Sequence, residues 1–170
     1  MALVAVVIAA GVYDLRTRKI PNWLTLSGVV LGLGFNTLLL HSHGLALAML
    51  GLGLSLLVYL PLYAVRGMGA GDVKLMAAIG SIAGPQSWLG IFLATAILGG
   101  VASVVLVLRR GRVHETMSNL ATITGELMHA RMPFEKDAGL DMHSGRALGL
   151  PHGAVIAAGT LVFLCLAGVA

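Results

Sequence analysis

The chain has 170 residues, of which 58% are apolar and only 11% are charged, whereas about a quarter of an ordinary soluble domain is charged. A small water-soluble fold exposes too much of its surface to hide so many apolar side chains, so the composition excludes a soluble domain, and it also excludes a disordered chain. The single cysteine, Cys165, excludes an internal disulfide framework and a multi-cysteine zinc site.

The apolar stretches are long enough for six membrane-spanning helices of about 20 residues each. In chain order, we predict helices near residues 2–15, 22–40, 45–65, 72–84, 87–108 and 151–169. The first and fourth are short for a hydrocarbon core of about 30 Å, so polar groups are expected to reach into the membrane there. A cleavable signal peptide is the competing interpretation of the first helix, but no basic residue precedes the apolar run, and we expect a span.

The basic residues predict the orientation, because positively charged loops stay on the cytoplasmic side of a membrane. All eleven fall in or beside three of the predicted connections, whereas the connections at 41–44 and 84–87 contain none. We therefore expect both termini on the outer side. The basic residues are Arg16, Arg18 and Lys19, then Arg66 and Lys74, then Arg109, Arg110, Arg112, Arg131, Lys136 and Arg146.

A polar cytoplasmic loop at about 109–149 separates the last two helices within a single membrane domain, 1–170. Its segment 113–131 mixes apolar and charged residues, so it is either a helix lying in the membrane interface or a flexible loop. Six basic and five acidic residues leave the loop a net charge of only +1. This balance argues against a nucleic-acid partner.

Two acidic residues lie outside that loop, Asp14 and Asp72, each at the cytoplasmic end of a short predicted helix. Pairing with a neighbouring base, for example Asp72 with Lys74, is the structural alternative, but two acids at matching depth favour a functional pair. Adjacent carboxylates share a proton, so the pair holds one base and one acid, the groups needed to hydrolyse a peptide with water. The same pair could instead carry protons in a transporter.

Three alternating glycines, Gly67, Gly69 and Gly71, precede Asp72 in the sequence GMGAGD. Glycine permits backbone angles closed to other residues and a close approach by an extended substrate, which favours proteolysis over proton transport. Asp72 is also expected at the start of its helix, where the helix dipole favours negative charge. Helix packing is the usual role of glycines in membrane proteins, and we expect it for Gly51, Gly53, Gly99 and Gly100.

Three segments resemble the signature blocks of the type IV prepilin peptidases, membrane aspartic proteases with a GxGD motif. They are YDLRTRKIPNWLTL around Asp14, GMGAGDVKLMAAIG around Asp72 and LPHGAVIAAG near the C-terminus. The resemblance implies an all-α, polytopic membrane protein with six transmembrane helices and the GxGD aspartic protease fold. It also implies that Asp14 and Asp72 are the catalytic dyad, which needs neither a metal ion nor a cofactor.

The resemblance further implies a substrate, the precursor of a pilin or pseudopilin. Cleavage would follow a glycine that ends a short basic leader, at the cytoplasmic face of the bacterial inner membrane. Gly69 and Gly71 would admit the substrate backbone. Lys74 would orient the substrate or tune the dyad, with a snorkelling lysine as the alternative, and Asn22 would hydrogen-bond near the site or cap the helix that Pro21 starts.

Some features depart from the larger family members, which carry a zinc-binding domain with paired cysteines and often methylate the new pilin N-terminus. With one cysteine, this chain resembles the short, peptidase-only form of tight-adherence (Flp-type) pilus systems, and methylation stays open. The usual Pro-Tyr-Gly appears as Pro151-His152-Gly153, and we expect His152 to be a surface residue, with a hydrogen bond near the site as the alternative. His41 and His43 lack a third ligand for a metal ion.

Three other functions remain possible for this sequence. A presenilin-like intramembrane protease shares the GxGD motif, but it would need a Pro-Ala-Leu element that this sequence lacks. A proton-coupled membrane transporter would show transport that depends on both acids. A non-catalytic pilus-assembly subunit would tolerate replacement of both acids by asparagine.

Overall fold

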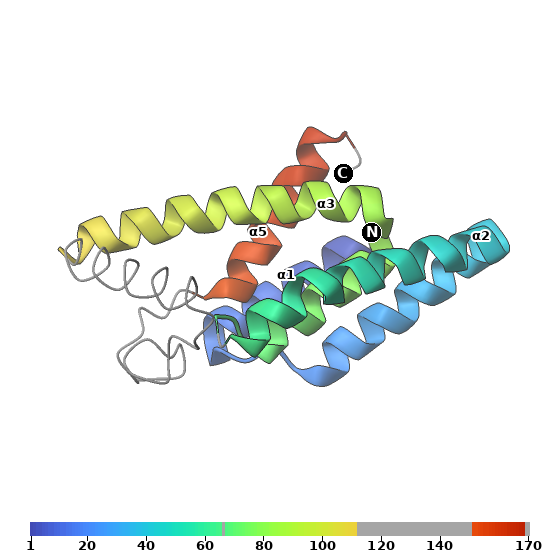
Figure 1. Ribbon diagram of the computed structural model, residues 1–170, viewed down its shortest axis with the longest axis horizontal. Helices are drawn as coiled ribbons and strands as arrows, with labels where there is room; N and C mark the ends of the chain where they lie inside the picture. Colours follow the sequence, from blue (N-terminus) through green and yellow to red (C-terminus); the bar gives the residue numbers. More distant parts are fainter. Residues whose placement is uncertain (66, 112–150, 169–170) are drawn as a thin grey trace, which may run out of the picture.

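All regular structure in the described residues, 1–65, 67–111 and 151–168 of the computed structural model, is helical (Figure 1). This finding confirms the predicted all-α class for those residues. The predicted loop at about 109–149, with its segment 113–131, lies outside the described residues except for its first three. The helices are α1 (Ala2–Thr17), α2 (Asn22–Ala64), α3 (Ala70–Arg109) and α5 (His152–Leu166).

Both long helices are interrupted by one residue with non-helical backbone angles. In α2 this residue is His41 (φ 52°, ψ −136°), and in α3 it is Gly84 (φ 73°, ψ 173°). At each point the chain turns back on itself, so α2 and α3 each consist of two arms (Figure 1). The arms correspond to the four helices predicted between residues 22 and 108. The expected loops at 41–44 and 84–87 are sharp bends instead, and glycine suits the positive φ of the second.

Asn36 secures the bend of α3. Because Pro85 has no N–H group, the carbonyl oxygen of Ser81 has lost its helical partner. The Nδ2 group of Asn36 donates to this oxygen at 3.1 Å and to the carbonyl oxygen of Ile82 at 3.2 Å. An unpaired carbonyl is costly in an apolar environment, so this side chain both stabilises the bend and ties α2 to α3. The residues next to Asn36 in the chain do not predict this role.

Small residues set how closely the helices approach. A Cβ atom on Gly51 of α2 would collide with the carbonyl oxygen of Gly80 in α3, and one on Gly80 would collide with that of Gly51. A Cβ atom on Gly99 would lie 3.5 Å from a valine of α5. The predicted packing role is confirmed for Gly51 and Gly99. It is wrong for Gly53 and Gly100, where a Cβ atom would meet nothing within 4 Å.

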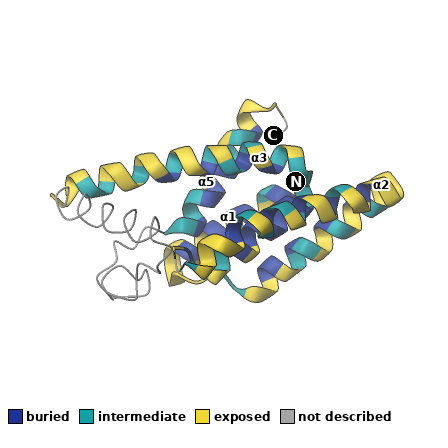
Figure 2. Ribbon diagram, in the orientation of Figure 1, coloured by how far each residue is buried: buried dark blue, intermediate teal, exposed yellow. Residues whose placement is uncertain are grey.

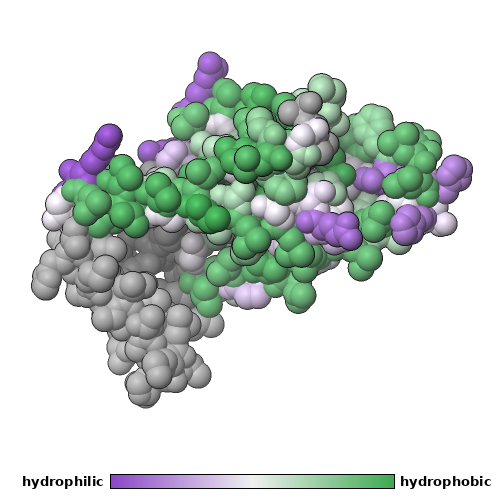
Figure 3. Space-filling model, turned by 90° about the horizontal axis from the view of Figure 1, so that it is seen from above, coloured by the Kyte–Doolittle hydropathy of each residue, from purple (hydrophilic) through white to green (hydrophobic). Residues whose placement is uncertain are grey.

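The buried core lies mainly along α1 and the first arm of α3, while the outer faces of α2 and α3 are exposed (Figure 2). Many exposed side chains are large and apolar, for example Leu38 at 78% and Leu57 at 72% exposure. Figure 3 shows such side chains covering most of one face. By length and composition, α2 and α3 can cross a membrane, and α5 is a shorter apolar helix. Apolar surface of this extent fits a transmembrane protein.

Candidate active site

Asp14 lies on the buried face of α1. Helical periodicity places it on the same side as Val7, Ala10 and Gly11, which all face the core. Its side chain is only 7% exposed, whereas the adjacent Leu15 is 63% exposed. The sequence thus directs a carboxylate inward at the end of an otherwise apolar helix, where it needs polar partners.

The N-terminal end of α5 supplies one such partner. The backbone N–H of Ala154 donates to Oδ2 of Asp14 at 3.1 Å. The first N–H groups of a helix have no partner within the helix and carry partial positive charge, so they suit a carboxylate. A Cβ atom on Gly153 would lie 3.1 Å from Cβ and Cγ of Asp14 and 2.8 Å from Cδ1 of Ile20. Glycine at this position therefore lets α5 pack against the end of α1.

His152, the first residue of α5, also lies near Asp14. The two side chains are close enough for their charges to interact, and His152 is half-buried. The expectation of a surface histidine is therefore wrong. The reason is tertiary, because the first turn of α5 packs onto the end of α1, and that contact cannot be read from the local sequence.

Asp72 lies in the first turn of α3, which starts at Ala70, two residues earlier than predicted. Gly69 precedes the helix as its N-cap residue, and its carbonyl oxygen accepts the backbone N–H of Asp72 at 3.1 Å. Asp72 is half-buried, and it lies near Asp14 at a distance over which the two charges interact. The fold thus brings together two acids that the whole of α2 separates in the chain.

Asp72 also has a buried tyrosine as a neighbour, which local sequence patterns did not predict as a site residue. Tyr59 of α2 is 2% exposed, and its phenol interacts electrostatically with Asp72. Its ring makes edge-on contacts with Trp88 and Phe92, whose centroids lie 6.2 and 6.0 Å away. The phenol of Tyr59 within the apolar sequence of α2 indicates that a polar partner is needed. Only the fold shows that this partner is Asp72.

The glycines before Asp72 have different surroundings. A Cβ atom on Gly69 would lie 3.3 Å from Oδ2 of Asp72, whereas one on Gly71 would lie 3.3 Å from Cβ of Ile20 in the connection between α1 and α2. Neither of them, nor Gly67, adopts a left-handed φ. The prediction that they use backbone angles reserved for glycine is wrong. Instead, the missing side chain of Gly69 leaves space beside the Asp72 carboxylate, and that of Gly71 leaves space for Ile20.

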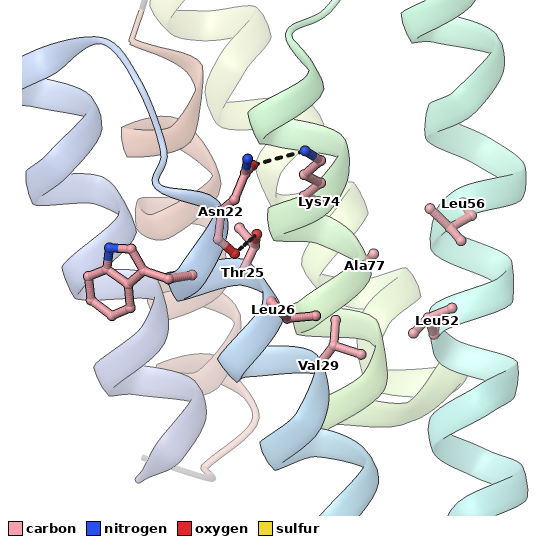
Figure 4. A pocket seen from close by; sticks show the side chains of 9 residues that line it. Asn22, Thr25, Leu26, Val29, Leu52, Leu56, Lys74 and Ala77 are labelled. Carbon is pink, nitrogen blue, oxygen red and sulfur yellow. Dashed lines mark hydrogen bonds between the residues drawn. The ribbon is translucent and has the colours of Figure 1, made fainter.

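Lys74 and Asn22 interact with each other. Nζ of Lys74 donates to Oδ1 of Asn22 at 2.9 Å, which joins the starts of α3 and α2 (Figure 4). Lys74 thus bonds a neutral partner, not Asp72 as in the structural alternative, because residues two apart point to different sides of a helix. The capping alternative for Asn22 is wrong, since Pro21 is the N-cap residue and the Asn22 side-chain oxygen faces Lys74.

Comparisons with known proteins confirm the resemblance. The profile of the Type IV leader peptidase family matches residues 1–104, which include Asp14 and Asp72 but not α5. Three similar relatives are each named prepilin leader peptidase/N-methyltransferase. The one from Escherichia coli K12 is 37% identical over 106 residues, covering 59% of this chain and 47% of the relative. The one from Neisseria gonorrhoeae is 30% identical over 131 residues, covering 74% and 46% respectively.

The third relative, from Pectobacterium carotovorum, is 35% identical over 127 residues, covering 71% of this chain and 45% of the relative. The chain therefore spans about half the length of the curated relatives that it matches. No solved structure gives a significant match. The family profile covers more than half of the chain, including the first two of the three signature blocks. The chain belongs to the Type IV leader peptidase family.

Proposed function

We propose that the chain is a membrane-embedded aspartic endopeptidase that removes the leader of type IV prepilin-like precursors. Cleavage follows a glycine at the cytoplasmic face of the bacterial inner membrane. The observation that carries this proposal is that Asp14 and Asp72, which come from different helices, lie close enough at one end of the molecule for their charges to interact. The names of the relatives support the substrate class.

The proposed membrane arrangement has six spans: α1, the two arms of α2, the two arms of α3, and α5. The α1–α2 connection and the starts of α3 and α5 lie toward one end of the molecule, and the α2 bend lies at the other (Figure 1). The described basic residues belong to segments at the first end, so we assign that end to the cytoplasm. They are Arg16, Arg18, Lys19, Lys74, Arg109 and Arg110.

The short first arm of α3 explains how water reaches the dyad in this arrangement. This arm, from residue 70 to the bend at Gly84, spans about 21 Å against a hydrocarbon core of about 30 Å. With its bend near the outer side of the membrane, the arm leaves its cytoplasmic end below the membrane surface. Asp14 and Asp72 then lie at the floor of a depression that is open to the cytoplasm.

The dyad performs hydrolysis as one unit. The ionised carboxylate takes a proton from water while the water oxygen bonds to the scissile carbonyl carbon, and the protonated partner donates its proton to the carbonyl oxygen. The tetrahedral intermediate then collapses. The carboxyl group that took the water proton gives it to the amide nitrogen, the C–N bond breaks and the amine leaves. The other carboxylate takes a proton from a hydroxyl of the intermediate, so the products are a carboxylic acid and a free amine and the dyad is restored. No covalent enzyme intermediate forms, so no nucleophilic serine or cysteine is needed.

The supporting residues shape access to this pair. Gly69 has no side chain beside Oδ2 of Asp72, which leaves the space next to the carboxylate open to an extended substrate backbone. Gly71 keeps the start of α3 close to the α1–α2 connection. The hydrogen bond between Lys74 and Asn22 fixes the start of α3, and thereby the depth of Asp72.

A cleavage assay tests the proposal. The purified full chain, in lipid, is mixed with a precursor whose short basic leader ends in glycine, and the products are identified by mass spectrometry. Asp14→Asn and Asp72→Asn should each slow cleavage by more than about a hundredfold while the protein stays folded and inserted, because asparagine keeps the shape but cannot exchange the proton. A chelator should leave the wild-type rate unchanged.

Other outcomes point elsewhere. Undiminished cleavage by either variant would contradict the dyad, and loss of activity with the chelator would indicate a metal site. If the folded wild-type chain cuts none of several precursors, the transporter and assembly functions become the better explanations, and proton flux in liposomes separates those two.

A further inference from the structure

A groove with a volume of about 670 Å³ is lined by residues that include Lys74, two positions after Asp72 in the chain (Figure 4). Its walls come from both arms of α2 and the first arm of α3. One end is polar and contains Asn22, Thr25 and Lys74, whereas the apolar remainder is formed by Leu26, Val29, Leu52, Leu56 and Ala77. The groove therefore has a hydrophilic head and an apolar tail, arranged along the helix axes.

The groove is separate from the dyad. Neither Asp14 nor Asp72 belongs to the nine described residues that line it. Lys74 follows Asp72 by two residues, which places the two side chains about 200° apart around the helix axis. The face of α3 that carries Lys74 and Ala77 therefore differs from the face that carries the carboxylate.

The polar end suits an anion. Lys74 is the one charged side chain among the nine lining residues, and its ammonium group bonds a neutral amide oxygen at 2.9 Å. With that oxygen occupied, the side chain of Asn22 presents its N–H hydrogens. Trp23 also lines the groove and is 61% exposed, and aromatic side chains of this kind are enriched at membrane–water interfaces.

The apolar part of the groove suits a hydrocarbon chain. Its lining consists of the aliphatic side chains of Leu26, Val29, Leu52, Leu56 and Ala77, which offer no hydrogen-bonding group. In a membrane, the molecules that join such a chain to a charged head group are the lipids.

We infer that this groove binds one anionic phospholipid. The phosphate group lies against Lys74 and Asn22, and one acyl chain runs along the leucines and Val29 between the arms of α2. Basic pockets between transmembrane helices on the cytoplasmic side are suited to anionic head groups. This site does not depend on peptidase activity, although a lipid bound at Lys74 would brace the start of the helix that carries Asp72.

Native mass spectrometry of the full chain tests the inference. The protein is exchanged into detergent with phosphatidylglycerol or with phosphatidylcholine of the same acyl chains, and the retained lipid is counted. The wild type should retain the anionic lipid preferentially. Lys74→Gln should weaken its retention about fivefold, which corresponds to about 1 kcal/mol for one lysine near a lipid head group. Lys19→Gln, an exposed lysine outside the groove, should change it little.

A second pair of variants tests whether the apolar part of the groove holds the acyl chain. Leu56→Trp fills the groove and should reduce the retention of phosphatidylglycerol, whereas Leu57→Trp, on the neighbouring residue with 72% exposure, should not. Val29→Phe serves as an independent filling variant if Leu56→Trp fails to fold.

Several results would overturn the lipid site. These are equal retention of the two lipids, an equal loss in the two lysine variants, or binding of glycerol phosphate without acyl chains as tight as that of the whole lipid. Displacement of the lipid by a prepilin that cross-links to Leu52 would assign the groove to the substrate instead. Because the measurement requires no cleavage, its failure and the failure of the proposed peptidase function are distinguishable.

Discussion

The two aspartates are the same residue type at the same end of the molecule, but they are held in different ways. Asp14 is enclosed: it is 7% exposed, accepts a hydrogen bond from Ala154 and leaves no room for a side chain at Gly153. Asp72 is half-buried in the first turn of α3, with Gly69 beside it. Asp14 is thus held through its carboxylate by a tertiary contact with α5, whereas Asp72 is placed by the start of its own helix, which Gly69 caps and the Lys74–Asn22 hydrogen bond fixes.

The largest expected effect tests whether the two acids act together despite this difference. If they form one acid–base unit, the double variant Asp14→Asn/Asp72→Asn should be no more than about threefold slower than the slower single variant. Single-turnover rates with excess enzyme provide the comparison. If the two losses multiply, the acids contribute independently, and the shared-proton mechanism is wrong.

The next largest loss of activity is expected where Asp14 is enclosed by α5. Gly153→Ala adds a Cβ atom 3.1 Å from Asp14 and 2.8 Å from Ile20, so α5 or the carboxylate must shift. Because small displacements of a reacting group are costly, we expect kcat to fall by about tenfold to a hundredfold. Gly34→Ala is the matched control, since a Cβ atom there meets nothing within 4 Å. A Gly153→Ala variant with wild-type kcat would show that α5 does not position Asp14.

The surroundings of the half-buried Asp72 should tolerate an added methyl group better than those of Asp14. Gly69→Ala places a Cβ atom 3.3 Å from Oδ2 of Asp72, a tight contact that the half-buried carboxylate can relieve by turning. We expect kcat/KM to fall by only about threefold to tenfold, mainly through KM, because the added methyl group narrows the approach of the substrate. Gly67→Ala, on an exposed residue, is the control. If Gly69→Ala lowers kcat as much as Gly153→Ala does, Asp72 is as tightly enclosed as Asp14, and the contrast between the two aspartates is wrong.

Sequence patterns predicted those features that depend on a residue's neighbours in the chain. The apolar runs predicted the helical segments, the predicted connection at 84–87 contains the bend of α3, and the two acids outside the polar loop were the two that the fold brings together. Each of these inferences uses the neighbours of a residue in the chain or the cost of charge in an apolar setting.

The contacts that the sequence did not predict are all tertiary. Asn36, Tyr59 and His152 each stand out as polar residues in or beside apolar segments, but their partners lie in other helices. The same holds for the hydrogen bond between Lys74 and Asn22, which takes the place of the capping role considered for Asn22. Local patterns indicate that such a residue needs a partner, whereas only the packing of the helices shows which one it has.

The smallest expected effect on activity concerns the far end of the arm that carries Asp72. Asn36→Leu removes the donor to the carbonyl oxygens of Ser81 and Ile82 at the bend, which should lower stability by about 1–3 kcal/mol. Thr37→Val, whose hydroxyl donates to a carbonyl oxygen of its own helix at 2.7 Å, should cost less. Thermal unfolding in detergent measures both.

If the start of α3 holds Asp72, kcat of the Asn36→Leu variant should stay within about twofold of wild type at a temperature where the protein is folded, because the bend lies at the opposite end of the arm from the carboxylate. A loss of kcat as large as that of Gly153→Ala would show the contrary. Asp72 would then depend on tertiary contacts as much as Asp14 does, with Asn36 anchoring its arm as α5 anchors the end of α1.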